Sequence, residues 1–240
     1  DDSTEKIEAC LIQEEEHENA TLVRGEIAAI RARLATYDAD ARRSIELSRK
    51  ALALLPADDR FFRSNVRRNL GLAYILTGDL SNAKQALEDA VSLDRQTGNV
   101  VSLASNLRRL AEIAKMQAQL HPAQKLLQQA LDLTVDEYGH RLPIAFQALL
   151  SMGDLHREWN DLDGATEYIQ QGIDLISPSI EVWTSGGYIY LSRIKYAQGD
   201  IEGAEQAIQK AKQLALESKF SELDDFYADL YQARLWLSQG

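Results

Sequence analysis

A set of charged and aromatic side chains in this 240-residue chain has the types and spacing that a binding surface for a polar ligand needs. Guanidinium groups and carboxylates form directional hydrogen bonds with polar or charged groups, and tyrosine rings stack on flat ones. The candidate binding residues are Arg68, Arg108, Glu112, Lys115, Asp154, Arg157, Tyr190, Arg193, Tyr196 and Arg234. They predict a surface that binds a polar ligand or an acidic peptide.

The same residues also fit a purely structural role. Arg108, Glu112 and Lys115 are spaced by four and three residues, the separations at which side chains on one helix face form ion pairs. Each such pair adds only about 0.2–0.5 kcal/mol to helix stability. A solvated face with internal ion pairs is therefore the alternative for each single residue. Both interpretations place these side chains on helices.

Residues that could support catalysis or bind a metal are scattered. His17, His121, His140 and His156 lie in different segments, no H-E-x-x-H motif is present, and the single cysteine, Cys10, lies among acidic residues that would raise the pKa of a thiol. We therefore expect no catalytic residues, no metal and no cofactor in this chain.

Composition favours a helical protein. Hydrophobic residues make up 45% of the chain and charged residues 26%, with only 13 glycines and 4 prolines. The formal net charge is −11, and residues 1–18 hold eight acidic residues and one lysine. Without a basic stripe, we expect no direct binding of nucleic acid. Without an 18-residue apolar stretch or a disulfide pair, we expect no membrane span and a cytoplasmic location.

Small residues recur along the chain with a period of about 40 residues. The position of Ala83 recurs at successive offsets of 39, 40, 42 and 39 residues. The equivalent residues are Ser44, Ala83, Ala123, Ala165 and Ala204, and a second small position seven residues later contains Ala51, Ala90, Ala130, Gly172 and Ala211. Small side chains at helical spacing allow two antiparallel helices to approach closely. The pattern therefore predicts five helix pairs.

Turn residues precede the second helix of each pair. An aspartate stands where its side chain can cap that helix, and the residue before it is one that tolerates a left-handed backbone. The capping aspartates are Asp40, Asp79, Asp161 and Asp200, and the left-handed candidates are Gly78, Asn160 and Gly199. The third repeat departs from this pattern, with Ala118 and Gln119 at the turn.

These signals predict an all-α fold, an α-α superhelix (solenoid) of about 12 antiparallel helices. The helices are an acidic one near 3–17, five pairs between about 20 and 217, and a last one near 220–238. We expect a single domain over 1–240. Its predicted parts are the second helix of a truncated repeat (1–18), five repeats (19–57, 58–97, 98–139, 140–177 and 178–218) and the first helix of a truncated sixth (219–240). Two ends inside repeats suggest a segment of a longer protein.

The spacing of Gly71, Tyr74, Gly78, Asp79 and Ala83 resembles that of the tetratricopeptide repeat, although the period exceeds the usual ~34 residues. Three longer phrases narrow the resemblance. They are LVRGEIAAIRARLA at 22–35, LGLAYILTGDLSNA at 70–83 and LHREWNDLDGA at 155–165. They resemble the superhelical sensor domain of large ATP-binding transcriptional regulators of the LuxR class, of the MalT type.

This resemblance implies a function for the parent protein. In that family an ATP-binding module precedes the superhelix, a DNA-binding helix-turn-helix domain follows it, and the superhelix receives the inducer. This chain contains no G-x-x-x-x-G-K-[ST] loop, so ATP would be bound elsewhere in the parent protein. The implied partners are a small-molecule inducer, such as an oligosaccharide or another metabolite, or a regulatory protein, and the parent protein would self-associate. The candidate binding residues would line the concave groove.

A free-standing adaptor of the co-chaperone type is the alternative. There a groove of basic and amide side chains holds the terminal carboxylate of a partner peptide. Asn65, Arg68, Asn69 and Arg109 partly resemble such a clamp, but Leu72 stands where that clamp has asparagine.

Overall fold

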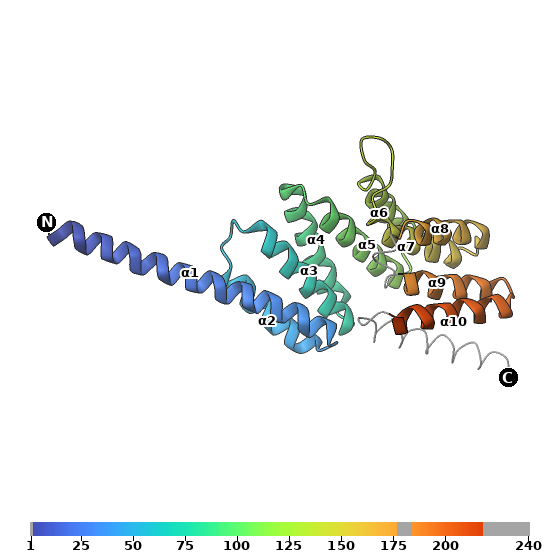
Figure 1. The fold of residues 1–240 in the computed structure, drawn as a ribbon, viewed down its shortest axis with the longest axis horizontal. Coiled ribbons are helices and arrows are strands. Elements are labelled where there is room, and N and C mark those ends of the chain that lie inside the picture. The colour runs from blue at the N-terminus through green and yellow to red at the C-terminus, as the bar shows by residue number, and fades with distance from the viewer. Residues whose placement is uncertain (1, 177–183, 218–240) are drawn as a thin grey trace. The chain divides into compact units, whose positions relative to one another are not determined.

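The structure, a computed structural model, describes residues 2–176 and 184–217, with side chains from residue 19 onward. These residues form ten α-helices and no strand beyond an isolated bridge between Val135 and Arg141 (Figure 1). The helices are α1 (Asp2–Tyr37), α2 (Ala41–Leu54), α3 (Arg60–Leu76), α4 (Leu80–Thr97), α5 (Val100–Met116), α6 (Leu120–Asp132), α7 (Ala145–Glu158), α8 (Leu162–Asp174), α9 (Thr184–Ala197) and α10 (Ile201–Glu217). The predicted all-α fold is confirmed.

The small residues of the repeat lie inside the helix pairs, as predicted. At the first small position every residue is at most 1% exposed, and at the second position Ala51, Ala90, Ala130 and Ala211 are fully buried. Gly172 is buried as well. Because a bare Cβ or hydrogen separates the two backbones there, each second helix packs directly on the helix before it.

Each turn inside a pair has the same backbone form. The residue before the N-cap has a positive φ in every repeat: Ala39 (55°), Gly78 (77°), Ala118 (58°), Asn160 (60°) and Gly199 (80°). The predicted aspartates accept hydrogen bonds from the backbone N–H three residues later, at 2.9–3.1 Å. Gln119 makes no such bond. The equivalent donor would be residue 122, which is a proline without an N–H.

The predicted helix count is too high by one in the described residues. The acidic helix near 3–17 and the first helix of the five pairs, which was expected to start near residue 20, were predicted to be separate. Both belong to α1, and the predicted boundary between residues 18 and 19 lies inside it. Neither glycine nor proline occurs between His17 and Thr21, so nothing in the local sequence ends the helix. The last predicted helix, 220–238, lies outside the described residues.

The chain divides into two compact units, which we call unit 1 (1–113) and unit 2 (114–240). In unit 1, Ala51 of α2 and Leu55, the residue that follows α2, pack with Val66 of α3 and with two alanines of α1. In unit 2, Ile169 of α8 and Ile194 of α9 pack with residues of α7. Each unit therefore has its own core, and a single domain over 1–240 stays a prediction.

The turn between α5 and α6 offers a direct test of backbone strain. Ala118 has a φ of 58°, where an L-residue with a Cβ is less stable than glycine. We expect Ala118→Gly to raise the free energy of unfolding by about 0.5–1 kcal/mol. Ala20→Gly, in the helical backbone of α1, should lower it by a similar amount. Urea denaturation measures both variants, and a loss of stability in Ala118→Gly would contradict the assigned turn.

The contact between α7 and α8 offers a second test. A Cβ on Gly153 would lie 2.7 Å from two carbons of Ile169 and 2.9 Å from the carbonyl oxygen of Ala165. Gly153→Ala should therefore lower the free energy of unfolding by about 1–3 kcal/mol. A Cβ on Gly186 of α9 meets nothing within 4 Å, so Gly186→Ala should keep or slightly raise stability. Equal effects at the two sites would show that the helices are not in close contact.

Candidate ligand-binding surface

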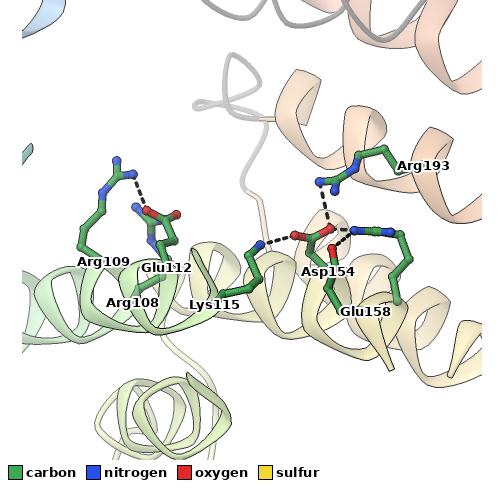
Figure 2. Close-up of polar contacts among 8 residues, drawn as sticks. Arg108, Arg109, Glu112, Lys115, Asp154, Glu158 and Arg193 are labelled. Atoms are coloured by element: carbon green, nitrogen blue, oxygen red, sulfur yellow. Dashed lines mark hydrogen bonds and ion pairs between the residues drawn. The ribbon is translucent and has the colours of Figure 1, made fainter. Parts of the chain in front are cut away.

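Three basic side chains converge on one buried carboxylate in unit 2 (Figure 2). Asp154 of α7 is 1% exposed. Its Oδ1 accepts from Arg193 Nη1 of α9 at 2.8 Å and from Arg157 Nε, one turn along α7, at 3.1 Å. Its Oδ2 accepts from Lys115 Nζ of α5. We call these four residues, with Glu158, the Asp154 cluster.

The Asp154 cluster has more positive than negative charge. Glu158 accepts a hydrogen bond from Arg157 Nη2, so three cations face two carboxylates and leave one net positive charge. The side chains of Lys115, Arg157 and Arg193 are 26%, 19% and 24% exposed. The buried anion therefore holds three cations in place at a partly solvated surface, which can attract an anionic or strongly polar group.

The basic side chains also change the titration of Asp154. Burial by itself would raise the pKa of its carboxyl group. The charges of Arg193 and Lys115 and the hydrogen bond from Lys115 outweigh burial and hold this pKa below its usual value. Asp154 is therefore ionised at neutral pH although it is almost fully buried.

The repeat register explains why these side chains meet. Ala111, Gly153 and Ser192 occupy equivalent positions in α5, α7 and α9, and all three are buried. Burial of that position fixes the rotation of each helix about its axis. Residues one and four positions later then lie on the same side of successive first helices. Asp154 and Arg193 follow the small residue by one, and Lys115 and Arg157 follow it by four.

Arg108 and Glu112 form a separate ion pair in unit 1. Glu112 accepts from Arg108 Nη1 and, through its second oxygen, from Arg109 Nη1 at 2.9 Å. The predicted helix-internal pairing is thus confirmed for Arg108 and Glu112. Lys115 instead pairs with Asp154, 39 residues further along the chain. The expected support of Arg108, Glu112 and Lys115 for one another is correct only in part.

Arg68 of α3 is half-buried and held by neutral partners. Its Nη2 donates to Asn65 Oδ1 at 2.7 Å and its Nη1 to Ser102 Oγ of α5 at 3.3 Å. Burial, followed by the charge of Arg33, lowers the pKa of Arg68. Arg68 therefore belongs to the interior of unit 1 more than to a free binding surface.

A buried polar network beside Arg68 was not anticipated. Asp94 of α4, 1% exposed, accepts from Ser64 Oγ of α3 and from Asn106 Nδ2 of α5, the latter at 2.7 Å. Asn106 Nδ2 also lies 3.4 Å from Ser102 Oγ. The sequence did hold a signal, because Asp94 follows Ala90 and Val91 in the apolar register of α4. An acidic residue in that register must be buried and needs hydrogen-bond partners.

The two predicted tyrosines, Tyr190 and Tyr196, lie on α9. The Tyr190 ring lies 5.7 Å from Arg193 Cζ, so it adjoins the Asp154 cluster. Tyr196 is 42% exposed on α9. Arg234 lies outside the described residues. The sequence did not identify Glu158 as part of this surface.

The partial carboxylate clamp is not displayed as the adaptor interpretation requires. Asn69 is only 5% exposed, Asn65 accepts from Arg68, and Arg109 pairs with Glu112. Asn65 and Arg68 are thus bonded to each other, and Arg109 is bonded to a residue outside the clamp. The fit to a peptide carboxylate is correspondingly weaker than the sequence suggested.

The described part of the chain contains neither a cluster of metal ligands nor a membrane-spanning helix. Among its side chains, no three histidine, cysteine or acidic residues come together as a group that could hold a metal ion. Of its helices, none combines the length and the apolar character that crossing a bilayer requires.

Repeated helix pairs with buried small residues and a common turn define a tetratricopeptide-type repeat protein. The family described as "MalT-like TPR region" matches residues 25–240, and the chain belongs to this family. The HTH-type transcriptional regulator MalT of Vibrio cholerae serotype O1 is 24% identical over 205 residues, which are 85% of this chain and 22% of the relative. MalT of Yersinia enterocolitica is 23% identical over 199 residues. The chain therefore spans about a fifth of the length of these relatives.

Solved structures share the fold. BtubC from P. vanneervenii matches with a TM-score of 0.65 and 19% identity, covering 88% of this chain and 87% of that one. The Rap conjugation gene regulator of plasmid pLS20, in complex with the Phr* peptide, matches with a TM-score of 0.64 and 15% identity, covering 82% and 53%. The resemblance inferred from the repeat residues is confirmed at the level of family and fold.

Replacement of Asp154 should lower the stability of the fold more than replacement of any other residue of the Asp154 cluster. We expect Asp154→Asn to lower the free energy of unfolding at pH 7 by about 2 kcal/mol, because three cations would lose their common anion. The partial exposure of those cations limits the loss. Asp163→Asn on the surface of α8 is the control and should change stability by less than about 0.5 kcal/mol.

The pH dependence of this loss has a defined sign. The folded-state pKa of Asp154 is lowered, so its stabilisation is complete above the pKa of an unfolded aspartate, about 3.9. It is lost as the pH falls through the folded-state value. The difference between wild type and Asp154→Asn in urea denaturation should be constant from pH 7 to 5 and shrink below pH 4. A difference that grows on acidification would contradict the assigned ion pairs.

Proposed function

We propose that this chain is the sensing domain of a MalT-type transcriptional regulator and that it receives its ligand or partner at the Asp154 cluster. The observation that carries the proposal is the convergence of Lys115, Arg157 and Arg193 on one buried carboxylate. Membership of the MalT-like family supports the regulatory context. The domain itself is non-catalytic under this proposal, and it acts by binding.

The ligand is a small-molecule inducer, such as an oligosaccharide or another metabolite, or a regulatory protein. Arginine and lysine heads at a partly solvated surface donate to hydroxyl, carboxylate or phosphate oxygens. The Tyr190 ring beside Arg193 adds a flat surface for stacking. That the Rap regulator in the structural comparison carries a peptide supports a protein or peptide partner for this fold in general.

The proposed mechanism links binding to the geometry of neighbouring helix pairs. Arg157 lies on α7 and Arg193 on α9, and both are tied to Asp154. A ligand that draws the Arg193 guanidinium away from Asp154 changes the contact between α9 and α7, whereas Arg157 pairs with Asp154 within α7. It shifts the equilibrium only as far as its affinities for the two arrangements differ. In the whole regulator this shift controls self-association and DNA binding by domains outside this chain.

The test is calorimetric titration of the chain with a panel of oligosaccharides, organic acids, nucleotides and short acidic peptides. For any ligand that binds, Arg157→Gln with Arg193→Gln should weaken affinity by about tenfold to a hundredfold. The control is Arg67→Gln, an arginine of unit 1 whose side chain is 32% exposed and pairs with Asp89 at 3.1 Å. That variant should leave affinity unchanged.

Two results would overturn the proposal. One is the absence of any binder for both the chain and the intact regulator. The other is a binder whose affinity the double arginine variant does not change. Thermal unfolding of each variant separates loss of the surface from loss of the fold, and Lys115→Gln gives a milder change at the same cluster.

A further inference from the structure

The outer side of α2 carries four exposed cations. They follow one another at intervals of one, six and one residues, so helical geometry places them on one side, away from the buried positions of α2. The cations are Arg42, Arg43, Arg49 and Lys50, which we call the α2 basic face. Arg42 and Arg49 are two turns apart, as are Arg43 and Lys50, which is about 10 Å along the helix axis.

Carboxylates near the α2 basic face leave an excess of positive charge. Glu46 on the same side and Asp38 in the preceding turn form no ion pair with the four cations among the described residues. Asp40 is the N-cap of α2 and accepts from the backbone N–H three residues later at 3.1 Å. Arg49 donates from Nη2 to the neutral Oη of Tyr74 at 2.9 Å. The cations therefore remain available to an anionic partner, although the chain as a whole has a formal net charge of −11.

The second helices of the other repeats do not share this charge. In the repeat register, the positions of Arg42 and Arg49 hold serine and glutamate in α4, histidine and glutamine in α6, aspartate and glutamine in α8, and glutamate and glutamine in α10. The positions of Arg43 and Lys50 hold one cation in those four helices, which is Lys210 of α10. The packing of a helix pair therefore does not account for the cations of α2.

The α2 basic face lies on a side of the helix that the neighbouring repeats leave uncovered. Helix α4 has a helix pair on each side of its own pair in sequence, yet Ser81, Asn82 and Glu88, three of its four equivalent residues, are exposed. The fourth, Asp89, is half-buried. Because the repeats share one register and one turn backbone, a helix pair that precedes α1 would leave the α2 basic face exposed as well.

The layout of the α2 basic face fits an acidic helix better than a small anion. Two rows of cations along about 10 Å of a helix surface are too spread out to surround one phosphate or carboxylate group. Carboxylates at three-, four- and seven-residue spacing on a second helix would lie opposite several of them at once. Arginine donors suit this role, because a guanidinium group can bind a carboxylate through two parallel hydrogen bonds.

The charge of the rest of the chain argues against an extended polyanion. Duplex nucleic acid and an anionic membrane reach far beyond one helix face, and residues 1–18 alone hold eight acidic residues and one lysine. These would be repelled by such a partner. A short acidic segment meets only the α2 basic face, because charges more than about 10 Å away are largely screened at physiological ionic strength.

We propose that the α2 basic face docks an acidic helix of a partner protein, whose carboxylates pair with its four cations. This surface is distinct from the Asp154 cluster, because α2 belongs to unit 1 and Asp154 to unit 2. The inference does not rest on the proposed function, and failure of either one leaves the other standing.

Fluorescence anisotropy with a labelled peptide tests the docking. The probe is an alanine-rich peptide of about 20 residues, long enough to form a helix, with pairs of glutamates repeated every seven residues. The variant with Arg42→Gln, Arg43→Gln, Arg49→Gln and Lys50→Gln should bind it at least about tenfold more weakly, because each exposed ion pair changes affinity by up to about fivefold. Its circular dichroism should be unchanged, since all four side chains are exposed.

A matched variant separates docking from the overall charge of the chain. It removes four exposed cations from other second helices, through Lys84→Gln, Arg95→Gln, Lys125→Gln and Lys210→Gln. Its net charge equals that of the first variant. It should bind the acidic peptide within about twofold of wild type, because the screened field of distant cations contributes little.

Charge reversal supplies a gain of binding that a loss of fold cannot imitate. Replacement of the four cations of the α2 basic face by glutamate should abolish binding of the acidic peptide. The same variant should bind the peptide's lysine counterpart about tenfold more tightly than wild type does.

Three results would overturn the proposal. One is the absence of acidic-peptide binding at low ionic strength, where exposed ion pairs are strongest. Another is an equal loss of affinity in the two glutamine variants. The third is tighter binding of duplex DNA or of phosphatidylserine vesicles than of the peptide through the same four residues, since the partner would then be a polyanion.

Discussion

Close approach of the two helices in each pair, at positions that admit only a small side chain, is the contact on which the rest of the structure depends. In α7 the contact is tight enough that Gly153 lies directly on Ile169 and on the carbonyl oxygen of Ala165 of α8. Burial of the small residue fixes the rotation of its helix about the helix axis. Every other position is thereby assigned to the core, to the neighbouring pair or to solvent. The same turn backbone in five repeats keeps that relation in register.

The Asp154 cluster is a consequence of this rotation. Lys115, Arg157 and Arg193 are far apart in sequence, yet each stands one or four residues after a buried small position. Their charges hold the pKa of Asp154 low in spite of burial, and the buried anion in turn keeps them together at the surface. Such an arrangement is a stabilising contact, and under the proposed function a ligand competes for donors that are already assembled. The proposed function uses this competition to convert binding into a change between neighbouring helices.

The two units differ in the chemistry of their exposed side chains. The ion pairs of the Asp154 cluster lie in unit 2, whereas α1 in unit 1 exposes several apolar side chains.

The amino-acid sequence by itself determined the helix pairs, their period, the buried small positions and the capping aspartates, because each follows from local spacing and from the conformational freedom of single residues. It also pointed to the charged residues that the register brings to one side. It misjudged the start of the chain, where no breaker ends the helix and α1 runs on through residue 18. Only the tertiary structure decided which charges meet. Lys115 pairs with Asp154 rather than with Glu112, Arg68 is held by Asn65 and Ser102, and Asp94 lies buried with Ser64 and Asn106. Long side chains can reach several partners from one helix position, and packing between helices selects among them.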